Sequence, residues 1–167
     1  MNLLQRATAI VAAIATSFLT LVGCDQQKIN ELEEGLSTEV EVRKAFGEPE
    51  TIWPEADGSR TFEYPRQPMG HRNYMITIDS AGVMTALRQV VAPHVFEQIQ
   101  PGMTQEQVRR MLGKPAKRMT YALKQETDWD WNWIDPPNRE MEFTVTFGEH
   151  GTVKRTASRE KMPQGDH

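Results

Sequence analysis

The chain has 167 residues and a formal net charge of −4, and 38% of its residues are hydrophobic while 25% are charged. These proportions are typical of a globular domain and argue against a disordered chain. The mild acidity argues against nucleic acid or an anionic lipid surface as the main partner, because both attract basic patches.

Residues 1–23 have the pattern of a cleaved secretion signal. Arg6 is the only charged side chain among them, and residues 7–22 form an apolar run without an ionisable group. This run contains several hydroxyl side chains and is shorter than the roughly 20 residues that a membrane-spanning helix needs. We expect residues 1–23 to be removed. Removal takes away Arg6 and changes the formal net charge from −4 to −5.

Cys24 is the predicted site of lipid attachment. Residues 21–24 are Leu-Val-Gly-Cys, which resembles the bacterial lipobox and stands where the apolar run ends. The alternative is a buried free thiol, since an unpaired cysteine is often a small core residue. Cys24 is the only cysteine, so the exported chain has no disulfide. We expect diacylglyceryl and N-acyl chains on Cys24, and each buried methylene would contribute about 0.8 kcal/mol to a permanent anchor.

The exported chain contains two copies of one sequence pattern. Residues 36–49 and 103–115 share, in order, Val, Arg, a basic residue, an apolar pair, Gly, a charged residue and Pro. In each copy a Thr followed three residues later by Glu or Gln predicts a capping box, and the apolar spacing predicts one buried helix face. Gly47 and Gly113 should close these helices. Residues 29–34 and 94–100 are candidates for a shorter preceding helix.

After each helix the apolar period changes to two. Alternating residues at 74–78 and 141–147 are followed by Gly-containing turns into residues 83–91 and 152–158, which predicts a hairpin in each copy. An earlier strand is expected at residues 60–64 in the first copy, and at 119–123 or 128–134 in the second.

The predicted fold is α+β, with two tandem units that each pack two short helices on a three- or four-stranded antiparallel β-meander. One face of each sheet is covered by helices and the other should stay open. We divide the chain into a signal (1–23), a first unit (24–91), a second unit (92–160) and a polar tail (161–167).

Several of these features together resemble the SmpA/OmlA (BamE-like) family of bacterial envelope lipoproteins. They are the lipobox cysteine, Gly-Met-Thr-x-x-x-Val-x-x-x-Leu-Gly-x-Pro at 102–115, its echo at 35–49, Phe-Glu-Tyr at 62–64, Pro-Met-Gly-His at 68–71, and the turn ending at Gly82 and Val83. The resemblance covers nearly the whole exported chain. It implies a lipid anchor and an accessory role in outer-membrane protein assembly, with the β-barrel assembly machine as the expected partner.

Two features depart from the family pattern. Family members carry one such unit, whereas two tandem units are similar to β-lactamase inhibitor protein, which covers an enzyme with a concave sheet surface. Asp25 follows the predicted acylated cysteine, and in enteric bacteria an Asp there resembles a signal for inner-membrane retention. We expect the periplasmic face of the outer membrane, and Asp25 leaves the inner membrane open as the alternative.

The sequence contains no pattern that indicates catalysis. The four histidines, His71, His94, His150 and His167, include no pair at a metal-ligand spacing. There is neither a glycine-rich phosphate loop nor a Gly-x-Ser-x-Gly elbow. We therefore expect no enzyme, no catalytic residue, no metal, no cofactor besides the covalent lipid, and no small-molecule substrate.

Residues 128–137 contain the most unusual pattern in the chain. Trp129, Trp131 and Trp133 alternate with polar residues, so in a strand all three indoles share one face. They can pack under the helices as core, or they can form an exposed aromatic platform beside carboxylates, as protein-binding hot spots commonly do. These three tryptophans are the candidate protein-binding residues.

The sequence thus predicts a membrane-anchored periplasmic lipoprotein that acts as a non-enzymatic protein-binding accessory in envelope protein assembly. The alternative is an inhibitor or sensor that binds a periplasmic enzyme, which the two-unit layout and the tryptophan face would suit.

Overall fold

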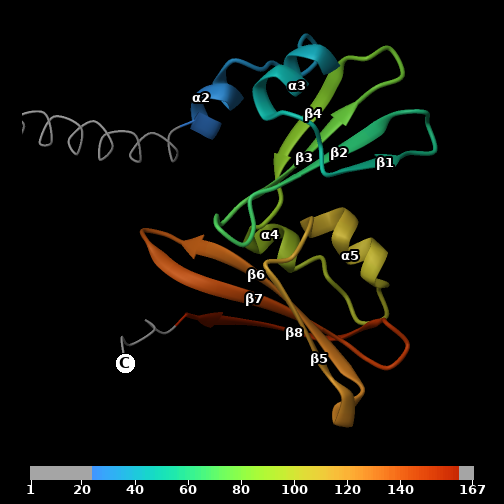
Figure 1. Cartoon of the computed structure of the whole chain (residues 1–167), viewed down its shortest axis with the longest axis vertical. Coiled ribbons are helices and arrows are strands. Elements are labelled where there is room, and N and C mark those ends of the chain that lie inside the picture. The colour runs from blue at the N-terminus through green and yellow to red at the C-terminus, as the bar shows by residue number, and fades with distance from the viewer. Residues whose placement is uncertain (1–23, 162–167) are drawn as a thin grey trace, which may run out of the picture.

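The computed structural model describes residues 24–161, which fold into two halves with the same order of elements (Figure 1). The first half contains α2 (Cys24–Asn30), α3 (Glu39–Phe46), β1 (Thr51–Pro54), β2 (Arg60–Pro65), β3 (Asn73–Ile78) and β4 (Met84–Gln89). The second contains α4 (Pro93–Phe96), α5 (Gln105–Leu112), β5 (Lys117–Tyr121), the 3-10 helix η1 (Ala122–Lys124), β6 (Glu126–Asp135), β7 (Arg139–Phe147) and β8 (Val153–Glu160). The predicted signal, and the predicted tail after residue 161, lie outside the described residues.

Each half has its own four-stranded antiparallel sheet, and neighbouring strands follow one another in the chain. The predicted α+β class and the antiparallel meanders are therefore confirmed. In the second half both candidate ranges for the early strand are strands, β5 and β6. The sequence did not predict β1, because four residues that end in Pro54 are too short to show alternation.

The two longer helices begin and end as predicted. Thr38 and Thr104 each accept a hydrogen bond from the amide three residues on, and the side chains of Glu41 and Gln107 bond back to the threonine amides. The helices end at glycines with φ of 83° and 74°, whose amides donate to the carbonyls of the arginines four residues earlier. Local sequence is sufficient to specify both helices.

The bounds of the shorter helices differ from those predicted. α2 spans residues 24–30 instead of 29–34, and α4 spans 93–96 instead of 94–100. Residues 31–37 instead form a turn that is tied to the sheet, because the Gly35 amide donates to the Met84 carbonyl at 2.8 Å. Tertiary hydrogen bonds of this kind are not visible as a sequence period.

Each sheet packs one face against its own helices. In the first half Val42 and Phe46 of α3 pack against strand residues that include Phe62 and Ile76. In the second half Val108 and Leu112 of α5 share one cluster with Phe96 of α4 and the three tryptophans of β6.

The reading of the tryptophans as an exposed platform is wrong. Trp129, Trp131 and Trp133 are only 5%, 0% and 7% exposed. The ring of Phe96 lies 5.4 Å from Trp133 and stacks at 4.0 Å on Phe143, so α4 closes over this face. Burial of these apolar rings stabilises the fold more than their exposure would, and the alternating polar residues take the opposite face.

We predict that Trp131→Ala lowers the free energy of unfolding by about 3–5 kcal/mol, because it leaves a large cavity. It also removes the hydrogen bond from the indole Nε1 to the Gly113 carbonyl, at 3.1 Å. Urea denaturation of the lipid-free domain would measure the loss. Tyr121→Ala is the control, because Tyr121 is 42% exposed and its removal should cost less; equal losses would contradict the core position of Trp131.

Candidate functional site

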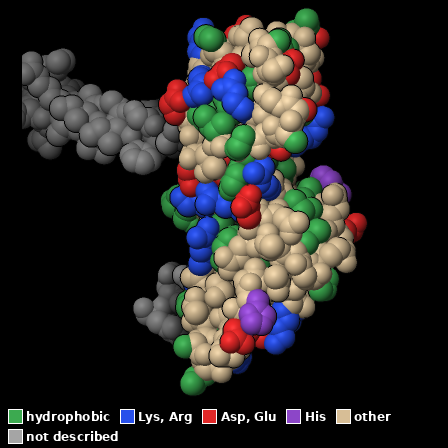
Figure 2. Space-filling view, turned by 90° about the vertical axis from the view of Figure 1, so that its right-hand side faces the viewer, with side chains coloured by type: hydrophobic (Ala, Val, Ile, Leu, Met, Phe, Trp, Pro, Cys, Tyr) green, Lys and Arg blue, Asp and Glu red, His purple; other side chains and the backbone are tan. Residues whose placement is uncertain are grey.

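Helix α5 lies between the two sheets and joins the halves (Figure 1). One side of it buries Val108 and Leu112 in the second core. The other side turns Arg109 and Arg110 toward the first half, where their guanidinium carbons lie 5.8 and 4.7 Å from the ring centre of Trp53. The prediction of an open face on the first sheet is therefore wrong, since α5 covers part of that face. Figure 2 shows Lys and Arg side chains gathered at mid-height, at the level where the halves meet.

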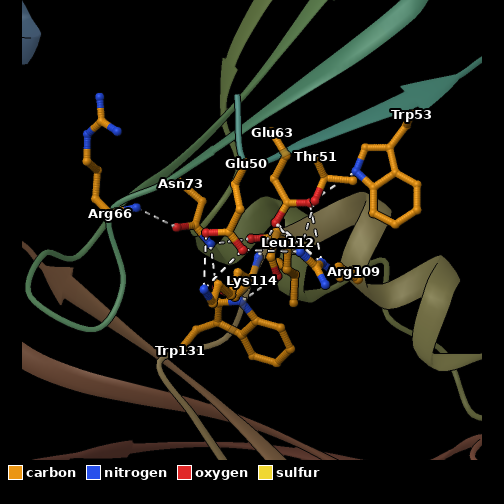
Figure 3. Close-up of polar contacts among 11 residues, drawn as sticks. Glu50, Thr51, Trp53, Glu63, Arg66, Asn73, Arg109, Leu112, Lys114 and Trp131 are labelled. Carbon is orange, nitrogen blue, oxygen red and sulfur yellow. Dashed lines mark hydrogen bonds and ion pairs between the residues drawn. The ribbon is translucent and has the colours of Figure 1, made fainter. Parts of the chain in front are cut away.

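Glu63 of β2 is the centre of this junction (Figure 3). Its side chain is fully buried, and its carboxylate accepts from the Lys114 amide at 2.8 Å and from Trp53 Nε1 at 3.1 Å. Arg109 donates through Nε and Nη2, each at 3.3 Å. A buried carboxylate is costly without such partners, so Glu63 favours the single arrangement in which α5 supplies them.

Two buried amides complete the junction. Asn73 Nδ2 donates to the carbonyls of Leu112 and Lys114 at 2.8 and 3.0 Å, which satisfies groups that the end of α5 leaves unpaired. Gln67 pairs with the backbone of Asn132 through both amide atoms, at 2.7 and 3.1 Å. The two halves are therefore held by hydrogen bonds, which fix their relative orientation as well as their separation. The sequence did not predict these residues, because isolated polar residues at or just beyond a strand end carry no periodic signal.

The helix-closing glycines offer a test of this close approach. Gly47 and Gly113 both have positive φ, but only Gly113 is crowded, since a Cβ there would lie 2.9 Å from Asn73 Nδ2. We predict that Gly47→Ala costs about 1–3 kcal/mol from backbone strain alone. Gly113→Ala should cost clearly more and weaken the junction. Chemical denaturation of both variants measures the difference, and equal costs would show that the contact with Asn73 is not tight.

The end of the chain that carries the predicted anchor is attached to the first half. Asp25, next to Cys24, forms a two-bond ion pair with Arg66, with Oδ2 to Nε at 2.8 Å and Oδ1 to Nη2 at 3.2 Å. The hydrogen bond from Arg66 lowers the pKa of Asp25. The guanidinium of Arg66 in turn lies 5.6 Å from the ring centre of Phe46. Acylation of Cys24 itself stays a prediction.

The second sheet keeps one face free of helices, and the polar residues of β6 lie on it. Glu126 is paired with Lys154 and Arg155, at 2.7 and 2.8 Å, and these cations lower its pKa to about 2. Glu142 pairs with Arg159. Within residues 24–161 no group of three or more His, Cys, Asp or Glu side chains is arranged to hold a metal ion.

Asp130 lies on this face too, and its carboxylate is buried without a cationic hydrogen-bond partner among the described residues. It is 7% exposed, and its Oδ1 accepts from the Thr144 hydroxyl at 2.7 Å. Burial raises its pKa, so ionised Asp130 destabilises the folded state at neutral pH.

We therefore predict that Asp130→Asn raises the melting temperature at pH 7, because Asn keeps an acceptor for Thr144 and removes the buried charge. The gain should shrink as the pH falls and disappear below the ordinary Asp pKa of about 3.9, where the carboxyl group is protonated in both the folded and the unfolded state. Thermal melts across pH would show this. Asp128→Asn is the matched control, since Asp128 accepts from Thr146 in the same way at 2.6 Å but is less buried; a gain for both would contradict the role of burial.

The hairpin of β5, η1 and β6 carries the exposed apolar residues of the second half. Met119, Tyr121 and Leu123 are 39%, 42% and 103% exposed. Figure 1 shows this hairpin projecting beyond the rest of the sheet, with η1 at its tip. The sequence predicted a strand here, but an alternating pattern does not show which of the two faces of a strand is exposed to solvent.

Comparison with known families bears on the second half. Residues 89–157 match the model of the outer membrane protein assembly factor BamE domain. The match covers 69 of the 167 residues, all of them in the second half and at its border with the first. This segment includes α4, α5 and most of the second sheet, so it contains both the buried tryptophans and the projecting hairpin.

Two solved structures resemble the chain more distantly. A putative osmotically inducible lipoprotein, OsmE, is 20% identical, with a TM-score of 0.36, and the match covers 40% of this chain and 75% of that one. A DUF4309 family protein, YjgB, from Bacillus subtilis subsp. subtilis str. 168 is 22% identical, with a TM-score of 0.30, and the match covers 78% and 82%. No curated protein matches the chain. Among residues 24–161, none of the helices has the length and apolar character needed to cross a bilayer.

Proposed function

We propose that the protein is an envelope lipoprotein, anchored through Cys24 at the periplasmic face of the outer membrane, that binds other proteins as a non-enzymatic accessory of outer-membrane protein assembly. The match of residues 89–157 to the model of the BamE domain is the observation that carries this proposal. The cysteine at the end of an apolar leader supports the anchor.

The helix-free face of the second sheet and its projecting hairpin are the surface best suited to a protein partner. The charges on this face largely pair with one another, as Glu126 does with Arg155 and Glu142 with Arg159. Beside them the hairpin exposes Tyr121 and Leu123. An apolar centre with a polar surround is the usual composition of a protein interface. The buried tryptophans support this surface from below and do not contact the partner themselves.

The inhibitor or sensor hypothesis loses one of its two supports, because the tryptophan face is core. The two-unit layout remains, but α5 stands between the sheets, so they do not form one continuous surface. A periplasmic enzyme as partner is therefore an outcome of the experiment below and not a second proposal.

The test is a mild-detergent pull-down of the acylated protein from native membranes, with identification of the co-purified proteins by mass spectrometry. Components of the β-barrel assembly machine are expected in the pull-down. Cys24→Ser is the control that separates anchoring from binding, since it should lose membrane association. Reproducible recovery of a single periplasmic enzyme, without assembly components, would contradict the accessory role.

We predict that the double variant Tyr121→Ala, Leu123→Ser weakens capture of the partner by about tenfold, as expected when exposed anchors at an interface are removed. The melting temperature should change little, because both side chains are exposed. Leu36→Ser is the matched control, since Leu36 is 69% exposed on the first half. Undiminished binding by the double variant would rule out the hairpin as the contact.

A further inference from the structure

The ion pair between Asp25 and Arg66 leaves no linker between the predicted anchor and the folded body. Arg66 directly follows strand β2, and Asp25 is the second residue of α2. Consecutive Cα atoms are about 3.8 Å apart, so Cys24 lies one residue away from a side chain that is held on the body. Lipid chains on Cys24 would therefore enter a bilayer beside the loop that Arg66 begins.

That loop, residues 66–72, is held tightly and presents an apolar tip. The Gly70 amide donates to the Arg66 carbonyl at 2.7 Å, and the Arg66 amide donates to the Arg72 carbonyl at 3.1 Å. Two backbone hydrogen bonds therefore cross the loop, one within it and one between its ends. Gln67 binds the backbone of β6 and fixes the loop to the second half as well. Met69 is nevertheless 93% exposed.

We propose that loop 66–72 and helix α2 form the membrane-facing end of the protein, with Met69 inserted among the lipid headgroups and the Asp25–Arg66 ion pair fixing the body relative to its anchor. The occupant of this surface is the bilayer that holds the lipid of Cys24, so the inference rests on the proposed anchor.

Charge and apolar character agree with a bilayer as the occupant. Lys28 belongs to α2 and Arg72 ends the loop, so both elements of this end carry positive charge besides Arg66. Their positive charges suit lipid phosphate groups, while the exposed, unbranched apolar side chain of Met69 suits the boundary with the acyl chains. In Figure 1 the tip of the β5–β6 hairpin lies toward the opposite end of the molecule from α2. Leu123 belongs to η1, which joins these two strands, so in this orientation it faces away from the membrane.

The single cysteine of the chain makes a direct experiment possible. Because Cys24 is the only cysteine, and acylation would block it, a second cysteine can be labelled alone. We would prepare acylated Met69→Cys, attach an environment-sensitive fluorophore, and reconstitute the protein in phosphatidylcholine vesicles that contain a nitroxide-labelled lipid. Leu123→Cys, labelled in the same way, is the matched control.

The label at 69 should shift to a shorter emission wavelength and be quenched by the nitroxide lipid, whereas the label at 123 should show neither effect. Equal and weak quenching at both positions, in protein that sediments with the vesicles, would overturn the membrane-facing loop and leave the anchor intact. Protein that stays in the supernatant would show that the lipid anchor itself has failed, and the present inference would fall with it.

The ion pair is tested by Arg66→Gln and, from the other side, by Asp25→Asn. Both variants should still sediment with vesicles, but quenching of the label at 69 should fall by about twofold or more once the body can rotate on its anchor. Melting curves verify that each variant is folded. Unchanged quenching in both folded variants would overturn the role of the ion pair.

Discussion

The arrangement of the two halves depends on one buried carboxylate. Glu63 has no access to water, and its hydrogen bonds come from β1, from the side chain of Arg109 in α5 and from the backbone just after that helix. If α5 rotated or slid, the charge would lose partners in a place where water cannot replace them, which is far more costly than losing a surface ion pair. Glu63 thereby sets the position of α5, and α5 in turn covers Trp131 and the rest of the second core.

The same construction closes the helix in both halves. In the first, the Tyr64 hydroxyl donates to the Gly47 carbonyl at 2.9 Å; in the second, Trp131 Nε1 donates to the Gly113 carbonyl at 3.1 Å. Each time a large aromatic residue of the second strand satisfies a carbonyl that the helix end leaves free. The halves differ in what surrounds the glycine. Gly47 faces open space, whereas Gly113 abuts Asn73 of the other half, so one closing motif has also become part of the junction.

This geometry suits a protein that is held at one end and binds at another. The Asp25–Arg66 pair lies where the chain leaves its predicted anchor, and loop 66–72 connects that point to the second half through Gln67. The hairpin with Tyr121 and Leu123 belongs to the segment that matches the BamE domain model, and it projects away from the rest of its sheet. A rigid junction between these two ends would transmit the orientation given by the membrane to the surface that meets a partner, which a flexible linker would not do.

The sequence by itself determined the class of the fold, the two capped helices and the alternating strands, because capping boxes, helix-ending glycines and a period of two act within a few residues of the chain. It also placed the three tryptophans on one face of one strand. Only the tertiary structure decided that this face is core, since burial depends on α4 and α5, which lie elsewhere in the sequence. The junction residues Glu63, Asn73 and Gln67 could not be predicted for the same reason. Their partners in the second half are 39 to 65 residues away, and a polar side chain shows its role only when the groups that satisfy it are in place.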